Sequence, residues 1–148
     1  MSENLKIINL NSNSDNDNHP LKSPLLPNPK ACFRLLIFSP SNSGKSNLIK
    51  NIITRDEFGY NKYYCDNIFL FSKTVNIDSI FRDICLPKTH LYEEWKDDLV
   101  NNIMHYSKKQ KNGTLIILDD MITSSEVINN KKNNLLKTLF YQGRHYKI

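Results

Sequence analysis

Three short runs of apolar residues interrupt an otherwise polar chain of 148 residues. They are residues 31–38 (ACFRLLIF), 67–71 (NIFLF) and 114–118 (TLIIL). Runs that are this short and nearly unbroken are typical of strands covered on both faces, as in a parallel sheet. The pattern therefore predicts three buried strands.

Apolar residues at helical spacing lie between and after these runs. They predict helices over residues 45–53, 92–109 and 135–140, the last of which is stopped by Gly143. Strands that alternate with helices indicate an α/β fold with a parallel sheet.

The first 29 residues differ in composition from the rest. Residues 9–18 are, apart from Leu10, a run of Asn, Ser and Asp, and four prolines follow before residue 30. This stretch has too little apolar surface to offset the entropy of ordering it, apart from a patch at residues 5–10. We therefore predict a flexible leader over residues 1–29 and one domain over residues 30–148.

Charge and cysteine content narrow the class of protein. The net charge of +5 suits a polyanionic partner without requiring one. No run of 18 apolar residues and no secretory signal is present, so a membrane protein and a secreted protein are not expected. Cys32, Cys65 and Cys85 are scattered, which is typical of buried thiols in a reducing, intracellular compartment.

A candidate phosphate-binding loop separates the first predicted strand from the first predicted helix. It consists of Ser39, Pro40, Ser41, Asn42, Ser43, Gly44, Lys45 and Ser46, and the adjoining Asn47 is included in the predicted site. Backbone N–H groups of such a Walker A loop form a cradle for the phosphates of ATP. Lys45 is predicted to reach the β- and γ-phosphates, and the Ser46 hydroxyl to bind Mg²⁺. The alternative is a serine-rich turn that caps an ordinary helix.

The third predicted strand runs directly into two acids, Asp119 and Asp120. Asp119 is predicted to hold Mg²⁺, which prefers oxygen ligands. Asp120 is predicted to orient or deprotonate the attacking water, which favours hydrolysis over phosphate transfer to a small molecule. The alternative is a solvated turn at the end of the strand.

These segments resemble the poxvirus-type genome-packaging ATPases of large DNA viruses, within the FtsK–HerA superfamily of P-loop NTPases. The matching pieces are FRLLIFSPSNSGKSNLIKNI, DNIFLFSKT, TLIILDDM and the tail LLKTLFYQGRHYKI. The resemblance implies a parallel sheet of the additional-strand, catalytic-glutamate type, with Asp120 in place of the glutamate. Ser39 departs from the family's first loop glycine. The chain stops at Ile148, where the family begins its next strand, so the fold is expected to be incomplete.

The resemblance also implies a function and partners. It implies an ATPase that assembles as a homo-oligomeric ring and drives double-stranded DNA into capsids, with a capsid or portal-type protein as a further partner. The expected location is the cytoplasmic viral factory or the virion. Arg144 is a candidate arginine finger for a neighbouring subunit, and a DNA-backbone contact or a turn arginine is the alternative. Two other functions stay open, a truncated non-catalytic nucleotide-binding or interaction subunit and a small-molecule kinase.

Overall fold

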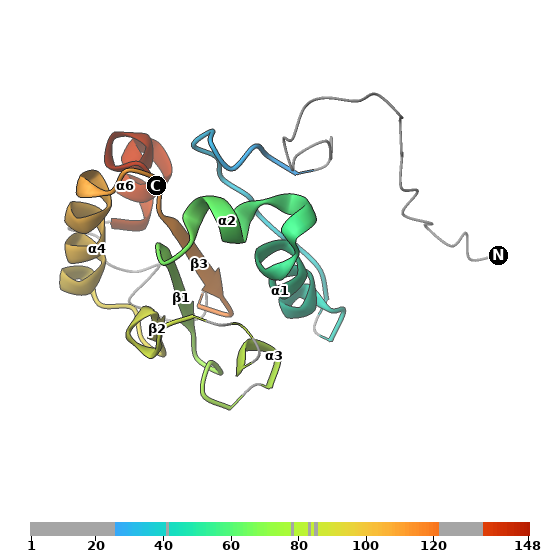
Figure 1. Cartoon of the computed structure of the whole chain (residues 1–148). Coiled ribbons are helices and arrows are strands. Elements are labelled where there is room, and N and C mark those ends of the chain that lie inside the picture. The colour runs from blue at the N-terminus through green and yellow to red at the C-terminus, as the bar shows by residue number, and fades with distance from the viewer. Residues whose placement is uncertain (1–25, 41, 78, 83, 85, 122–134) are drawn as a thin grey trace, which may run out of the picture.

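The computed structural model describes residues 26–40, 42–77, 79–82, 84, 86–121 and 135–148. Figure 1 shows a small sheet with helices on both sides. Among the described residues, no helix has the length and apolar character needed to cross a membrane. The elements in chain order are α1 (Lys45–Thr54), η1 (Asp56–Phe58), α2 (Tyr60–Tyr64), β1 (Ile68–Ser72), α3 (Ser79–Arg82), η2 (Lys88–His90), β2 (Leu91–Tyr92), α4 (Asp97–Lys109), β3 (Leu115–Asp119), α6 (Leu135–Gln142) and η3 (Gly143–Tyr146).

The sheet has three parallel strands in the order β2-β1-β3. In the register, Leu70 of β1 lies opposite Leu91 of β2 and Ile117 of β3. The α/β class, the parallel sheet and two of the three predicted strands are confirmed, with bounds shifted by one residue. β2 was not predicted, because its two residues are too short for a periodic signal.

Each face of the sheet carries its own hydrophobic cluster. Side chains alternate along β1, so that Ile68 and Leu70 belong to a first cluster, and Phe69 and Phe71 belong to a second. The first cluster packs against α1, α2 and α3, and the second packs against α4 and α6 (Figure 1). Because both faces of β1 are covered, every one of its residues is buried, which explains the unbroken apolar run.

Helix α4 begins later than the sequence predicts. Tyr92 pairs with Phe71 in the sheet, and its ring stacks on the Phe71 ring at a centroid distance of 5.0 Å. The helix starts at Asp97, which accepts a 2.9 Å hydrogen bond from the Trp95 indole nitrogen. The prediction that residues 92–96 are helical is wrong, because pairing with the sheet competes with the helical pattern.

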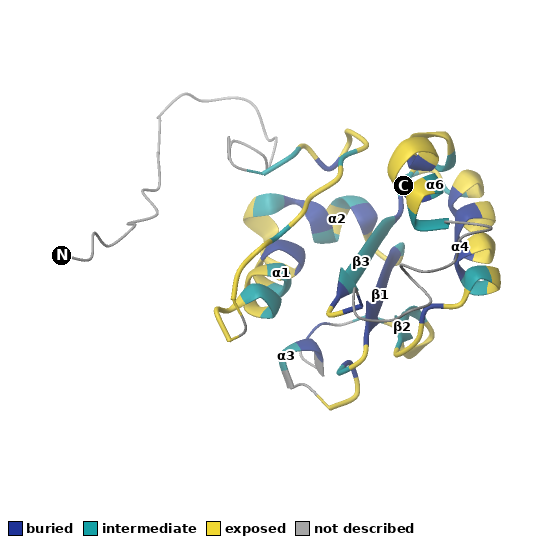
Figure 2. Ribbon diagram, turned by 180° about the vertical axis from the view of Figure 1, so that it is seen from behind, coloured by how far each residue is buried: buried dark blue, intermediate teal, exposed yellow. Residues whose placement is uncertain are grey.

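The predicted strand over residues 31–38 is also wrong. These residues form no strand, and Leu35, Leu36 and Phe38 are 46%, 62% and 83% exposed. Figure 2 shows this stretch as a largely exposed ribbon that runs past α1 and α2. A strand needs a partner for its backbone groups, and none of the described strands lies next to this segment.

The end of the leader is tied to the fold. The Tyr60 hydroxyl donates a hydrogen bond to the Pro27 carbonyl, and the Tyr64 hydroxyl donates one to the Pro29 carbonyl at 2.9 Å. Burial raises the pKa of the Tyr64 phenol, so this group stays a donor at neutral pH. Residues 1–25 of the predicted leader lie outside the described residues.

Two of the three cysteines differ from their predicted environment. Cys32 and Cys65 are exposed thiols, so the expectation of burial is wrong for them. Cys85 lies outside the described residues.

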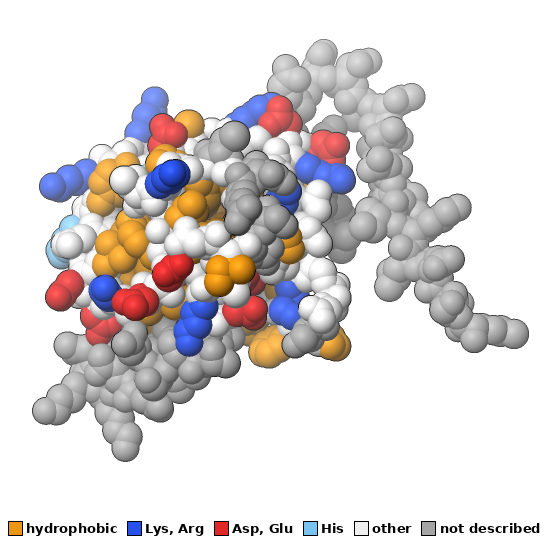
Figure 3. Space-filling model, turned by 90° about the horizontal axis from the view of Figure 1, so that it is seen from below, with side chains coloured by type: hydrophobic (Ala, Val, Ile, Leu, Met, Phe, Trp, Pro, Cys, Tyr) orange, Lys and Arg blue, Asp and Glu red, His pale blue; other side chains and the backbone are white. Residues whose placement is uncertain are grey.

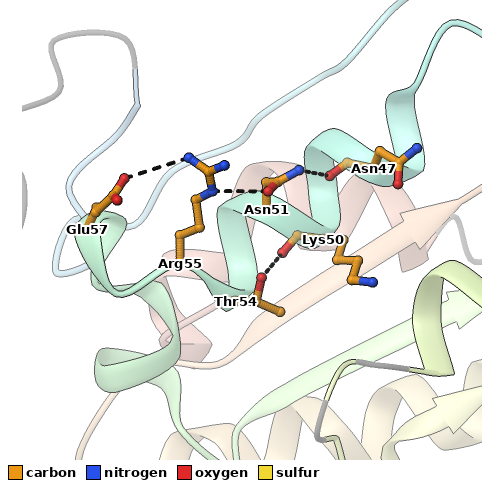
Figure 4. A network of polar contacts seen from close by, with 6 residues as sticks. All are labelled: Asn47, Lys50, Asn51, Thr54, Arg55 and Glu57. Carbon is orange, nitrogen blue, oxygen red and sulfur yellow. Dashed lines mark hydrogen bonds and ion pairs between the residues drawn. The ribbon is translucent and has the colours of Figure 1, made fainter. Parts of the chain in front are cut away.

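Side-chain contacts along α1 stabilise the helix that follows the loop (Figure 4). The Asn51 amide donates to the Asn47 carbonyl, and Arg55 donates to the Asn51 side-chain oxygen. Arg55 also lies 3.8 Å from Glu57, just past the helix end. This network lies on the exposed side of α1, while Ile52 and Ile53 anchor the opposite side in the first cluster.

Candidate phosphate-binding site

The loop before α1 contains two residues with left-handed backbone conformation. Gly44 immediately precedes the helix with φ = 90°, in the left-handed region, and Asn42 also has a positive φ of 59°. The Gly44 carbonyl accepts the first helical hydrogen bond, from the Leu48 amide. Such alternation of backbone conformation turns successive N–H groups inward. No heavy atom lies within 4 Å of the place where a Cβ of residue 44 would be, so its backbone conformation, not crowding, favours glycine.

Lys45 folds back across this loop. Its amino group donates hydrogen bonds to the carbonyls of Ser39 and Pro40, at 3.1 and 2.9 Å. These two contacts are exposed to solvent, so they are weakly held. In a phosphate-binding loop, a lysine at this position would exchange these carbonyl contacts for phosphate oxygens.

Serine is accommodated at the first position of the loop. Ser39 is not among the residues with positive φ, so this position does not need the freedom of glycine. The Ser43 hydroxyl lies within hydrogen-bond distance of both the Ser39 hydroxyl and the Pro40 carbonyl. The Ser39 side chain, which stands where a Walker A loop has its first glycine, therefore contacts the far end of the loop at Ser43.

The loop and the acid strand meet at the carboxyl end of the sheet. The Ser46 hydroxyl, in the first turn of α1, donates a 3.1 Å hydrogen bond to Oδ2 of Asp119, the last residue of β3. Asp119 is 5% exposed. The two residues lie 73 positions apart in the sequence, so the fold brings them together. A hydroxyl and a buried carboxylate in contact are oxygen ligands suited to Mg²⁺.

Asp120 has a different environment from its neighbour. It is exposed and lies just past the strand, with φ = 52°. This left-handed conformation is tolerated by Asp and Asn more than by most residues. Met121, which follows, is 1% exposed and anchors the turn in the second cluster. The adjacent carboxylates therefore divide into one that is buried and bonded and one that is open to solvent.

Ser72 was not recognised in the sequence. It ends β1, lies opposite Asp119 in the register and is completely buried. Its hydroxyl lies 3.2 Å from that of Thr74. The signal that could have revealed it is a pair of hydroxyl residues directly after an apolar strand, because carboxyl ends of neighbouring parallel strands meet at one edge of the sheet.

Arg144 lies away from these residues. It is exposed on η3, next to Lys147, whose carbonyl accepts a hydrogen bond from the Thr114 amide at the start of β3. Asp119 lies at the other end of that strand, about 16 Å further along. Arg144 therefore does not join the candidate site of its own chain.

Two predicted site residues remain, Ser41 and Asn47. Ser41 lies outside the described residues. Asn47 is exposed on the first turn of α1.

Figure 3 views the molecule from below, toward the carboxyl ends of the strands, and basic and acidic side chains are interspersed on this face. Charge alone therefore does not mark this face as one for a polyanion.

In the described part of the chain, no group of three or more His, Cys, Asp or Glu side chains is placed to hold a metal ion. Magnesium in phosphate sites is held by one or two protein oxygens together with substrate phosphates, and does not need such a group. Comparison with known proteins gives no match among family models, curated proteins or solved structures.

Proposed function

We propose that this chain is a P-loop ATPase module that binds ATP and Mg²⁺ and hydrolyses ATP to drive double-stranded DNA into viral capsids. The observation that carries the ATP site is the 3.1 Å hydrogen bond from Ser46 to Asp119, at the end of a backbone cradle. A turn that merely caps a helix has no need of a buried carboxylate against the first helical turn.

Each residue of the proposed site has a defined task. The loop amides and the Lys45 amino group bind phosphate oxygens, and Lys45 exchanges its two carbonyl contacts for them. Ser46 and Asp119 hold Mg²⁺, which when bound neutralises charge on the phosphates. Asp120, which is open to solvent, orients the attacking water and accepts its proton.

The coupling to DNA rests on the resemblance and on the exposed tail. Arg144 and His145 are both exposed on η3, remote from the site of their own chain. A residue that acts on a neighbour's nucleotide has to be exposed in this way, and this supports a homo-oligomeric ring in which Arg144 completes the next site. In this proposal the sheet is of the additional-strand, catalytic-glutamate type, and the protein works with a capsid or portal-type partner in the cytoplasmic viral factory or the virion.

A second candidate is a non-catalytic nucleotide-binding or interaction subunit. The exposed apolar side chains of Leu35, Leu36 and Phe38 favour it, because they lie together on the segment that leads into the loop. In this candidate, nucleotide binding without turnover controls association with another protein.

The magnesium site can be tested separately from turnover. We expect the wild-type chain to bind ATP more tightly with Mg²⁺ than with a chelator. Ser46→Ala and Asp119→Asn should each reduce this gain by about tenfold, because each removes one oxygen contact to the ion. Isothermal titration calorimetry with and without Mg²⁺ measures the difference.

Asp66→Asn is the matched control, because Asp66 is an exposed aspartate outside the site. Ser46→Ala leaves the backbone unchanged and therefore separates loss of the ion from loss of the fold. A magnesium gain of the same size in all four proteins would contradict the assigned ligands.

DNA binding has a distinct signature. If the basic residues of the chain contact phosphates, the affinity for double-stranded DNA should fall steeply with salt, with a slope of about −0.9 per phosphate contact in a double-logarithmic plot. Fluorescence anisotropy with a labelled duplex over a salt series measures the slope. A flat response removes DNA as a direct partner and leaves the ATP site unaffected.

A further inference from the structure

Four lysines come together at the end of the sheet opposite the candidate phosphate site. Helix α4 and the loop after it carry Lys108, Lys109 and Lys111, and Lys147 directly follows η3. All four are exposed, and we call them the basic face. Figure 1 shows the end of α4 beside the red C-terminal part of the chain. Arg144, on η3, borders this face.

Contacts between the two segments hold the basic face together. The Lys108 amino group lies 4.2 Å from the centroid of the Tyr146 ring. The Lys147 amino group donates a 2.7 Å hydrogen bond to the Gln110 carbonyl, and the Lys147 carbonyl accepts one from the Thr114 amide. The packing of η3 against the end of α4 therefore brings together lysines that are far apart in the sequence.

Few carboxylates offset these charges. Residues 99–118 and 135–148 contain no Asp or Glu. Asp66, just before β1, adds one exposed carboxylate nearby. Lys109 and Lys111 have no hydrogen-bond or ion-pair partner within the described residues. The basic face is therefore a surface of net positive charge with free cations, unlike the mixed face at the carboxyl ends of the strands.

Helix capping explains only part of this cluster. Cations in the last turn of a helix offset the negative end of its dipole, which accounts for Lys108 and Lys109. Lys147 binds the carbonyl of Gln110, the residue that caps the helix. Lys111 lies beyond the helix and has no such task in the described structure. Like charges that gather on one face repel one another, so the cluster is suited to a polyanion that neutralises it.

We propose that the basic face binds the phosphate backbone of duplex DNA. The choice of DNA as the polyanion rests on the proposed function, and the basic face adds where DNA contacts the chain. The lysine ammonium group is a compact point charge that binds phosphate whatever the base sequence. Asp119 lies at the other end of β3, about 16 Å away, so DNA and ATP occupy opposite ends of the sheet.

The salt dependence of DNA binding tests this assignment in the full chain. Lys109→Gln/Lys111→Gln removes two cations that make no contact within the described fold, so the melting temperature should stay close to that of wild type. We expect the slope of log affinity against log salt to fall in magnitude by about two, one for each lysine. Affinity for the duplex should weaken by about 3- to 10-fold. Two duplexes of unrelated sequence should weaken equally, because phosphate contacts carry no sequence information.

The matched control is Lys73→Gln/Lys96→Gln. Lys73 follows the carboxyl end of β1 and Lys96 precedes the first turn of α4, and both are exposed outside the basic face. This variant removes the same charge and should keep the wild-type slope. An equal fall in both double variants overturns the assignment, because DNA then responds to net charge.

The remaining outcomes separate the basic face from the proposed ATPase. A loss that differs between the two duplexes overturns the phosphate contacts, and a flat salt response of the wild-type chain overturns both the basic face and DNA as a partner. ATP affinity, measured in the same proteins, should be unchanged in Lys109→Gln/Lys111→Gln. A wild-type chain that binds the duplex through these lysines and does not bind ATP supports the basic face and contradicts the proposed ATPase.

Discussion

Replacing Lys45 with alanine is expected to weaken ATP binding by about 10- to 100-fold. Hydrogen bonds to charged groups contribute about 1.5–3 kcal/mol, and 1.4 kcal/mol is a factor of ten in affinity. Lys45 makes two such contacts to loop carbonyls, and in the proposed complex it makes them to phosphate oxygens instead. Competition against a fluorescent ATP analogue measures the change.

The fold should survive this substitution. Both contacts of Lys45 are solvent-exposed, so the melting temperature is expected to stay close to that of wild type. Lys88→Ala is the matched control. Lys88 is exposed on η2, so its substitution removes the same charge outside the loop. An equal loss of affinity in both variants would show that ATP responds to overall charge and not to the loop.

The sequence predicts β1 and β3 well and residues 31–38 badly, for one physical reason. All three segments are apolar runs, but a strand forms only where a second strand pairs with its backbone groups. β1 and β3 pair with each other, whereas no described strand lies beside residues 31–38. Periodicity reports which residues can be buried and carries no information about whether a partner is present.

The candidate site could also be predicted from the sequence only in part. The contact between Ser46 and Asp119 was predictable, because a helix that follows one strand and the carboxyl end of another meet at the same edge of an α/β sheet. The position of Ser72 opposite Asp119 was not predicted, because one serine after an apolar strand is a common turn residue. The remoteness of Arg144 depends on where η3 packs, which no local pattern encodes.

In the proposed site, the two neighbouring carboxylates have different tasks. A carboxylate that binds an ion has to be held in place, and Asp119 is buried and bonded to Ser46. A carboxylate that takes a proton from water needs access to solvent, and Asp120 has it. Substitution at these two positions should therefore affect different steps.

Asp120→Asn is expected to leave ATP binding unchanged and to lower kcat for hydrolysis by about 10²- to 10⁴-fold, the usual contribution of a general base. Asparagine tolerates the φ of 52° at this position, so the turn should keep its conformation. Phosphate release from ATP, measured on the full chain with double-stranded DNA present, gives kcat. Asp66→Asn, which removes an exposed carboxylate outside the site, should match wild type.

The result distinguishes the two candidate functions. Loss of turnover with retained binding supports a catalytic role for Asp120. A loss of binding as large as that of Lys45→Ala would contradict it, because an exposed carboxylate beside the metal ligand would then act in holding the nucleotide. Wild-type chain that binds ATP yet shows no turnover, even at high protein concentration with DNA, favours the non-catalytic subunit. In that case the cradle and the bond from Ser46 to Asp119 serve nucleotide-controlled association, and the exposed segment at Leu35, Leu36 and Phe38 is the surface on which to look for the partner.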